Sequence, residues 1–291
     1  MTKAIASPAI RALAARKGID LDELAQRLGR ETLAREDIEN AARNPADDLA
    51  SHWNVDHSAY GRVTEEPVTR MSLVAARRLV ASQVTIPAAT HHDTADFSAV
   101  EAFRESVKSE VKLRGIKLTA LAFHVAALSK CLQSFPKFNS SLSADGRTLV
   151  LKHYCHVGIA VDTTHGLVVP VIRNADRKGF VDIAGEITDL ASRAQQRKMR
   201  PDETGGASIT ISNLGGIGGT AFAPIVNPPE VAILGISCMK MQPIWKGTSF
   251  QPAPMVPLHL SYDHRVVNGA DAARFLAHHA KLLSEPRRLL L

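Results

Sequence analysis

The chain has 291 residues, of which 45% are hydrophobic and 22% charged, a composition typical of a globular protein with a sizeable core. The formal net charge is +6 at pH 7. The basic residues are spread along the chain, which disfavours nucleic acid and favours an acidic protein partner. The three cysteines form no CxxC pair, so neither a zinc site nor a disulfide framework is indicated.

Residues 1–43 have the pattern of a small helical module. Ser7 and Pro8 are typical of a helix start, and Gly18 is typical of a helix end. A second apolar stripe follows at helical spacing, and it comprises Leu21, Leu24 and Leu28. We therefore predict an all-helical domain over residues 1–43, and a linker over residues 44–66, where no apolar period is sustained.

Residues 67–291 have the pattern of a mixed α/β domain. Helical periodicity predicts helices over 69–82, 98–113, 117–133, 180–198 and 270–284. Strand-like runs predict strands over 155–162, 167–172, 208–212, 231–236 and 255–262. Because helices come early and strands cluster late, the order argues against a regular βαβ winding. It favours a mixed sheet covered by helices.

The most informative stretch is Asp263-His264-Arg265, which follows a predicted strand and precedes a predicted helix. An imidazole exchanges a proton near neutral pH, and it serves as a base when its tautomer and orientation are fixed. We expect Asp263 and Arg265 to pair and lock the turn, and Asn268-Gly269 to start the helix. On this pattern alone, a structural histidine is the commoner interpretation. The predicted buried face of the helix comprises Ala272, Phe275, Leu276, His279, Leu282 and Leu283.

The second informative stretch spans residues 208–220, SITISNLGGIGGT. A strand delivers the hydroxyl of Ser212 to the edge of a glycine-rich loop, where a ligand or another backbone can approach closely. A phosphate cradle is disfavoured because no Lys-Ser or Lys-Thr pair follows the glycines. A simple turn and a hydroxyl directed at an anionic intermediate both remain open.

Together these two stretches resemble a known family. The 2-oxo acid dehydrogenase complex acyltransferases have a C-terminal signature similar to DHRVVNG at 263–269. Within that family, the dihydrolipoamide acetyltransferases of bacterial pyruvate dehydrogenase complexes resemble ITISNLGGIGGTAFAPIVNPPEVAILGIS, QPIWKG and LSYDHRVVNGADAARF. The similarity extends through IPAATHHDTAD, FPKFNSSLSADG and VGIAVDTTHGLVVPVI. It therefore covers the chain from about residue 66 to the end.

The resemblance implies transfer of an acyl group from a dihydrolipoyl arm to coenzyme A, with acetyl favoured over branched-chain acyl and succinyl. His264 is then the general base that deprotonates the attacking thiol. Ser212 donates a hydrogen bond to the tetrahedral oxyanion. Asn268 stands where many members have aspartate, so it supports the loop and transfers no proton. The turn is supported by Asp263, Arg265 and Gly269. Coenzyme A is expected as a substrate, and no tightly bound cofactor is expected.

The resemblance also implies the chloramphenicol acetyltransferase-like fold, a mixed sheet covered by helices. Its active sites lie between the subunits of a homotrimer, so His264 of one chain would face Ser212 of the next chain. Assembly into a cube, into a dodecahedron or as a bare trimer remains open. A non-catalytic scaffold is the alternative function, although the intact His264 and Ser212 favour an enzyme. Bacterial cytoplasm is the expected location, with the mitochondrial matrix as the alternative.

The N-terminal module resembles the family's peripheral-subunit-binding domain through SPAIRALAARKGIDLDEL at 7–24. It is expected to dock the 2-oxo acid dehydrogenase or the dihydrolipoamide dehydrogenase component, and it disfavours a free-standing enzyme for small molecules. The candidate partner-binding residues are Arg11, Arg27 and Arg30. The family's glycine-rich loop is replaced by Gln26–Thr32, which leaves the choice of partner open. No lipoyl hairpin is present, so a lipoyl domain is expected in trans; its removal and its natural absence both remain open.

Two further groups of polar residues are candidates for a binding site. His91 and His92 are neighbours on an extended segment, so their side chains point to opposite faces and make a poor metal site. No metal is expected. Asn139 and Ser140 lie in a loop that borders the coenzyme A channel in the family. Contact with the substrate there and a solvent-facing loop are both open.

Overall fold

The computed structural model describes residues 4–42 and 55–290, and the side chains of Arg27, Ala42 and Leu290 are not among the described features. The chain divides into two compact units, residues 1–67 and 68–291. Of the predicted linker, residues 44–54 lie outside the described residues, and the part that follows contains the short 3₁₀ helix η2 (His57–Tyr60). In the described ranges, no helix combines the length and the apolar character that crossing a membrane requires.

The first unit contains three helices within residues 4–42, α1 (Pro8–Lys17), α2 (Leu21–Leu28) and α3 (Arg35–Ala42). The hydroxyl of Ser7 accepts a hydrogen bond from the backbone N–H of Ile10, and Gly18 ends α1 with a φ of +66°. A left-handed backbone of this kind favours glycine, because other side chains are strained there. The predicted helical module is confirmed. Its small core comprises Ala4, Ala14, Leu24, Ala25, Leu33 and Ile38.

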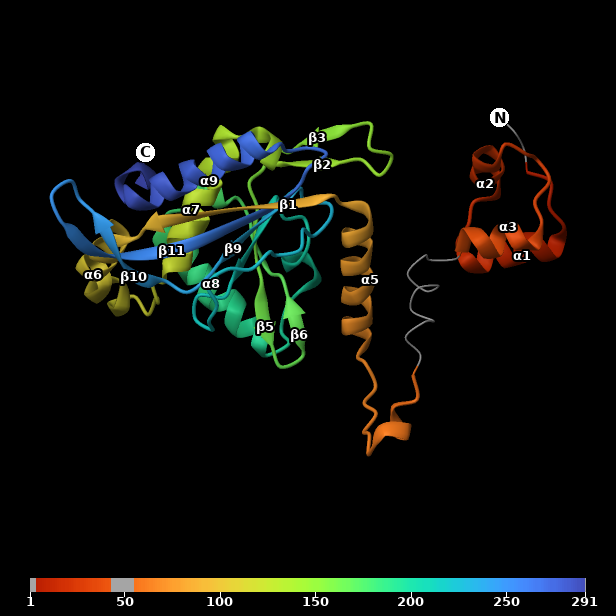
Figure 1. Cartoon of the computed structure of the whole chain (residues 1–291), viewed down its shortest axis with the longest axis horizontal. Helices are drawn as coiled ribbons and strands as arrows, with labels where there is room; N and C mark the ends of the chain where they lie inside the picture. The colour runs from red at the N-terminus through yellow and green to blue at the C-terminus, as the bar shows by residue number, and fades with distance from the viewer. Residues whose placement is uncertain (1–3, 43–54, 291) are drawn as a thin grey trace. The chain divides into compact units, whose positions relative to one another are not determined.

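Within residues 68–290 the chain forms a seven-stranded mixed sheet (Figure 1). Strands β4, β8 and β9 are parallel, and the other pairs are antiparallel. In sheet order the strands are β1 (Ala88–Asp96), β11 (Phe250–Asp263), β9 (Ala232–Ile236), β8 (Ile209–Asn213), β4 (Val157–Ile159) and β7 (Val171–Ile172), and β10 (Lys240–Trp245) pairs with β11. Two separate hairpins are β2 (Ser140–Leu142) with β3 (Leu149–Leu151), and β5 (Val161–Thr163) with β6 (Gly166–Val168).

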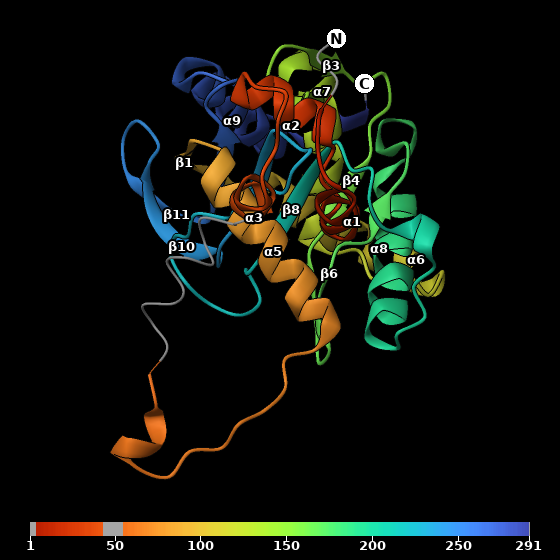
Figure 2. The same ribbon diagram turned by 90° about the vertical axis from the view of Figure 1, so that its right-hand side faces the viewer.

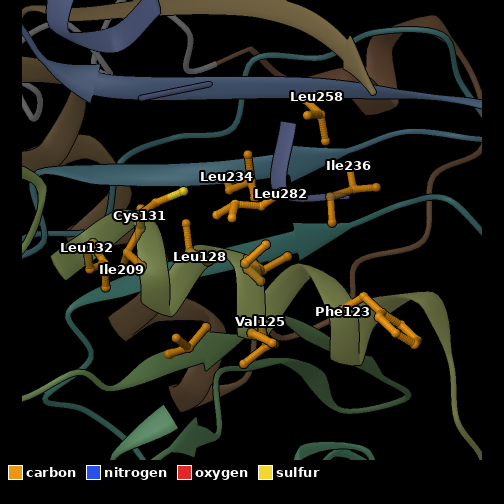
Figure 3. Packing of buried hydrophobic residues seen from close by; sticks show 14 of the residues in the cluster. Phe123, Val125, Leu128, Cys131, Leu132, Ile209, Leu234, Ile236, Leu258 and Leu282 are labelled. Carbon is orange, nitrogen blue, oxygen red and sulfur yellow. The ribbon is translucent and has the colours of Figure 1, made fainter. Parts of the chain in front are cut away.

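Four helices cover one face of this sheet and enclose the main core, and Figure 3 shows part of the packing inside it. They are α6 (Ser98–Leu113), α7 (Ala120–Ser134), α8 (Phe180–Gln195) and α9 (Gly269–Ser284). Helix α7 is apolar over most of its circumference, and it packs against the sheet through Val125, Leu128 and other buried residues. Each such side chain contributes roughly 1.5–3 kcal/mol by leaving water. The fold is thus a mixed sheet covered by helices, as predicted.

The opposite face of the sheet carries polar side chains. Ile211, Leu234 and Leu258 point into the core. The residues that alternate with them along the strands point to the opposite face, and they include Thr210, Ser212, Gly235, His259 and Ser261. Several of these polar side chains are buried. Helix α5 (Arg70–Thr85) lies beyond the end of the sheet at which β1 begins, to the right in Figure 1 and toward the viewer in Figure 2. Its Ser82 donates a hydrogen bond to the carbonyl of Val226 in the loop before β9. The two faces of the sheet therefore differ, since one packs its apolar residues under helices and the other carries polar side chains.

The remaining short helices connect these elements. They are η3 (Pro136–Phe138), η4 (Ala175–Arg177), η5 (Pro201–Glu203) and η6 (Pro286–Leu290). The predicted helix at 117–133 begins three residues later, and the one at 180–198 ends three residues earlier. Strands β1, β2, β3 and β10 have no counterpart among the predicted strands. Strands β3 and β10 are exposed over most of their length, and β1 and β2 are mostly half-buried, so hydrophobic alternation does not mark them.

Candidate active site

The turn that follows β11 presents His264 on the surface. Its backbone N–H donates to the carbonyl of Pro87, and its ring lies beside that of Tyr262, with centroids 5.7 Å apart. Among the described residues, no group hydrogen-bonds the imidazole. Both ring nitrogens are therefore open to a ligand or to another chain.

Asp263 and Arg265 pair as predicted and hold this turn. Arg265 Nη2 lies 2.6 Å from Asp263 Oδ2, Arg265 Nε lies 2.9 Å from Oδ1, and the backbone N–H of Arg265 also donates to Oδ1. The Asp263 side chain is buried, and its charge raises the pKa of Arg265 through these hydrogen bonds. Because a two-pronged contact of this kind fixes both groups, the backbone on either side of His264 is held in place.

Asn268 starts helix α9, as predicted. Its side-chain oxygen accepts a hydrogen bond of 2.8 Å from the backbone N–H of Asp271. The N-cap contact uses the oxygen and leaves the Asn268 amide N–H₂ free to donate, since no described residue accepts from it. The buried residues of the helix are Ala272, Phe275, Leu276, His279, Leu282 and Leu283. They are the predicted set, so the turn is held by a helix that is packed along its whole length.

Ser212 lies near the carboxyl end of β8, half-buried and at the edge of the glycine-rich loop. It is paired with Gly235 on β9, and Gly235 is paired with His259 on β11. Its hydroxyl has no hydrogen-bond partner within the described residues. The structure therefore places the Ser212 hydroxyl at the edge of the glycine-rich loop, as predicted.

Within one chain, Ser212 and His264 lie at opposite ends of the sheet. The pairing places Ser212 level with His259 on β11, and His264 is five residues further along. At about 3.3 Å per residue this is roughly 16 Å along the strand, and two strand spacings add to it. Two side chains this far apart within one chain cannot both contact the same carbonyl group.

Asn139 and Ser140 are buried and bound to backbone. The Asn139 amide N–H₂ donates to the carbonyls of Lys152 and Tyr154, and the Ser140 hydroxyl donates to the carbonyl of Lys137. The Asn139 side-chain oxygen is buried and has no partner in the described structure. These two residues therefore hold the β2–β3 hairpin in place, and only the Asn139 oxygen is left over for another role.

Two of the three candidate partner-binding arginines make contacts inside the first unit. Arg11 donates to the backbone carbonyls of Ala4 and Ala6. Arg30 forms an ion pair with Asp37, whose other oxygen accepts from the N–H of Ala34 at 2.7 Å. The side chain of Arg27 lies outside the described features. Arg11 and Arg30 therefore stabilise their own domain, which sequence reasoning had not foreseen.

The described residues contain no group of three or more His, Cys, Asp or Glu side chains arranged to hold a metal ion. His92 and His259 do meet, a contact the sequence gave no means to predict. Burial raises the pKa of Cys155 to about 12, so its thiol is not an activated nucleophile. The reactive groups of the site are then hydroxyls and imidazoles.

Comparison with known proteins assigns the family. The model of the 2-oxoacid dehydrogenases acyltransferase (catalytic domain) family matches residues 60–291. The chain belongs to this family. A curated relative from Pseudomonas aeruginosa, the dihydrolipoyllysine-residue acetyltransferase component of pyruvate dehydrogenase complex, is 43% identical over 99% of this chain. The chain spans 55% of the length of that relative.

Two solved structures have the same fold. One is a dihydrolipoamide acetyltransferase of Azotobacter vinelandii, studied for the roles of a serine, a histidine and an asparagine in its catalytic mechanism. It is 48% identical, with a TM-score of 0.80, over 81% of this chain and 98% of that one. The other is the cubic core of a pyruvate dehydrogenase multienzyme complex, 49% identical, with a TM-score of 0.80 and the same coverage.

Proposed function

We propose that the chain transfers an acyl group, most favourably acetyl, from dihydrolipoamide to coenzyme A, as part of the core of a 2-oxo acid dehydrogenase complex. The observation that carries this proposal is the placement of Ser212 and His264, whose side chains make no hydrogen bond within the described residues and lie at the two ends of one sheet. Relatives that share this fold act as dihydrolipoamide acetyltransferases. Branched-chain acyl and succinyl are the other candidate groups.

In the proposed mechanism, His264 removes the proton from the thiol of coenzyme A, and the thiolate sulfur attacks the carbonyl carbon of the acylated dihydrolipoyl arm. Ser212 donates a hydrogen bond to the oxygen that becomes negative in the tetrahedral intermediate. The intermediate collapses, the carbon–sulfur bond to the lipoyl arm breaks, and the leaving sulfur takes the proton from the His264 imidazolium. Asn268 holds the start of α9 and transfers no proton.

The separation of Ser212 and His264 supports a site shared between two copies of the chain. In a cyclic trimer, each chain would contribute its His264 to one site and its Ser212 to the next. A relative whose structure is the cubic core of such a complex supports assembly of trimers into a larger particle. The lipoyl arm would come from another domain or chain, and residues 1–43 would dock dehydrogenase components. A bacterial cytoplasmic location fits this proposal.

The test uses two inactive variants together. His264→Ala should lower transfer from acetyl-dihydrolipoamide at least 100-fold, as loss of a general base does, and Ser212→Ala should lower kcat about 100- to 1000-fold with little change in the KM for coenzyme A. When equal amounts are unfolded and assembled together, about a quarter of the shared sites would hold both wild-type groups. Activity should then return toward that level.

Separately assembled variants that are mixed without unfolding are the control, and they should stay inactive. If co-assembly restores nothing while each variant forms normal particles, the shared site is wrong. If the parent chain transfers no acetyl, branched-chain acyl or succinyl group from a well-formed particle, the scaffold function is favoured instead.

A further inference from the structure

Two histidines from distant parts of the chain meet on the polar face of the sheet. His92 Nδ1 on β1 lies 2.8 Å from His259 Nδ1 on β11, and the two rings meet edge to face with centroids 4.9 Å apart. The other nitrogen of His259, Nε2, lies 2.8 Å from the hydroxyl oxygen of Ser237. An imidazole, a second imidazole and a hydroxyl therefore form one hydrogen-bonded chain.

This series of hydrogen bonds runs from solvent into the protein. The His92 side chain is exposed, whereas His259 and Ser237 are each only 2% exposed. Burial lowers the pKa of His259, and the neighbouring His92 lowers it further. His259 is therefore stable in its neutral form, and only at exposed His92 can water solvate a positive charge on this pair.

Ser237, at the inner end of this series of hydrogen bonds, lies beside Ser212. Directly paired residues share a face of a sheet, so Ser212, Gly235, His259 and His92 form one row across β8, β9, β11 and β1. Ser237 is two residues beyond Gly235 on the same face, which makes it the diagonal neighbour of Ser212. Diagonal neighbours lie roughly 7–8 Å apart, within reach of a bound group that spans them.

The space above this row is closely fitted. A Cβ on Gly235 would lie 2.8 Å from the Phe222 ring and 3.2 Å from the Cβ of His259. The Phe222 ring also contacts the His259 ring, with centroids 5.3 Å apart. His259 therefore has little freedom to turn, and its two nitrogens keep their partners.

Among the described residues in direct contact with His259, His92 is the one with an ionisable side chain. From β9 it meets Gly235 and Ser237, from the loop before β9 it meets Phe222, and from β1 it meets His92. The nearest carboxylate on its own strand face is that of Asp263, four residues along β11, and Arg265 neutralises it.

The protons shared among His92, His259 and Ser237 determine which way the Ser237 hydroxyl donates. A Nδ1···Nδ1 contact holds one proton between the rings. When His92 is neutral, either ring can supply it, so the Nε2 of His259 either accepts from the Ser237 hydroxyl or donates to it. When His92 is charged, both of its nitrogens carry protons, so it donates to the Nδ1 of His259. The proton of His259 must then be on Nε2, where it donates to the Ser237 oxygen, and the Ser237 O–H is released to donate elsewhere.

We propose that His92, His259 and Ser237 form a tautomer relay, in which a proton on exposed His92 commits the buried Ser237 hydroxyl to donate toward the space beside Ser212. No charge enters the interior, because only the position of the proton on His259 changes. His92 and His259 are positioning residues for a hydrogen bond to the reacting acyl group. This role at the acyl-transfer site rests on the proposed function, whereas the relay itself rests on the three contacts alone.

The relay is tested first without activity, on the assembled particle with ¹⁵N-labelled histidine. Solid-state NMR distinguishes the two neutral tautomers of a histidine and its imidazolium. As pH falls from 8 to 5.5, His259 should move to the Nε2–H tautomer in step with protonation of His92. In His92→Gln, which keeps a polar partner that does not titrate, the tautomer of His259 should not change with pH. His91→Gln, altered on the opposite face of β1, is the matched control and should behave as the parent.

The kinetic consequence is a pH-dependent difference in kcat. The ratio of kcat for the parent to that for His92→Gln should rise as pH falls, by about two- to ten-fold, which is the effect of one neutral hydrogen bond. In a Ser237→Ala background the ratio should be flat. Formation of an imidazolium at His259, or a tautomer that ignores His92→Gln, would overturn the relay in an active enzyme. If the parent transfers no acyl group, the proposed function fails, and the NMR result alone decides the relay.

Discussion

A second pair of histidines lies inside the main core, and we expect it to make the protein sensitive to acid. His124 on α7 and His279 on α9 are 1% and 0% exposed, and His124 Nδ1 lies 3.2 Å from His279 Nε2. Phe97 stacks on the His124 ring, and Cys131 Sγ lies 3.9 Å from His279 Nδ1. No carboxylate contacts either ring in the described part of the chain. The pair is therefore stable in its neutral form.

Burial lowers the pKa of His124 from 6.5 to about 3, and it lowers the pKa of His279 well below 6.5. Below pH 6.5 the unfolded chain binds protons at these histidines and the folded chain does not. Their contribution to the free energy of unfolding is therefore fully present above pH 6.5 and is lost as pH falls toward 3. The interval from the unfolded pKa of 6.5 down to pH 4 is 2.5 pH units. At 1.36 kcal/mol per unit, His124 alone accounts for a loss of about 3 kcal/mol, and His279 adds to it in the same direction.

The perturbation that tests this account is the double variant His124→Leu/His279→Leu, which replaces both rings with apolar side chains of similar size. The loss of unfolding free energy between pH 7 and pH 4 should shrink by about 3 kcal/mol or more. Guanidinium titrations at fixed protein concentration measure it, since assembly makes stability depend on concentration. His278→Gln, one residue along α9 and only partly buried, is the control and should retain most of the slope. A double variant with the parent's pH slope would refute the reasoning and assign acid loss to carboxylates.

The remaining predictions concern backbone positions beside the proposed site. Gly235→Ala should lower the free energy of unfolding by about 1–3 kcal/mol, because the added Cβ would meet the Phe222 ring; a Tm equal to the parent's would show that this ring moves aside freely. Asn268→Ala should cost about 0.5–2 kcal/mol through loss of the α9 N-cap, and Asn268→Asp, which keeps an acceptor for the N–H of Asp271, should restore it. If Asn268→Asp is as unstable as Asn268→Ala in thermal unfolding, the cap is not what Asn268 supplies.

The elements that burial holds together were readable from the sequence. Helix α6 occupies the predicted range 98–113, and α9 begins one residue before its predicted start. Both carry apolar residues on one face, which is the signal that hydrophobic periodicity detects. Strand β1 lacks this signal, since only Ala95 among its nine residues is buried. It is held by pairing with β11 over its whole length, and backbone hydrogen bonds leave no hydrophobic pattern in the sequence.

The same distinction separates the parts of the candidate site. The turn around His264 is local: its ion pair joins residues two apart, and the Asn268 cap joins residues three apart, so adjacent letters of the sequence predicted both. The contact between His92 and His259 joins residues 167 apart. It exists only because β1 pairs with β11 in one register, and a shift of one residue would turn His92 to the other face.

Strand direction also explains why the proposed site would need more than one chain. Strands β8 and β11 run in opposite directions, since β8 is parallel to β9 and β9 is antiparallel to β11. The carboxyl ends of β8 and β11, which carry Ser212 and His264, must therefore lie at opposite ends of the strands, however the intervening loops are built. Substitution in those loops cannot bring the two groups together. In the proposed trimer a second copy of the chain would supply the missing group, because a head-to-tail interface brings two different surfaces of the chain together.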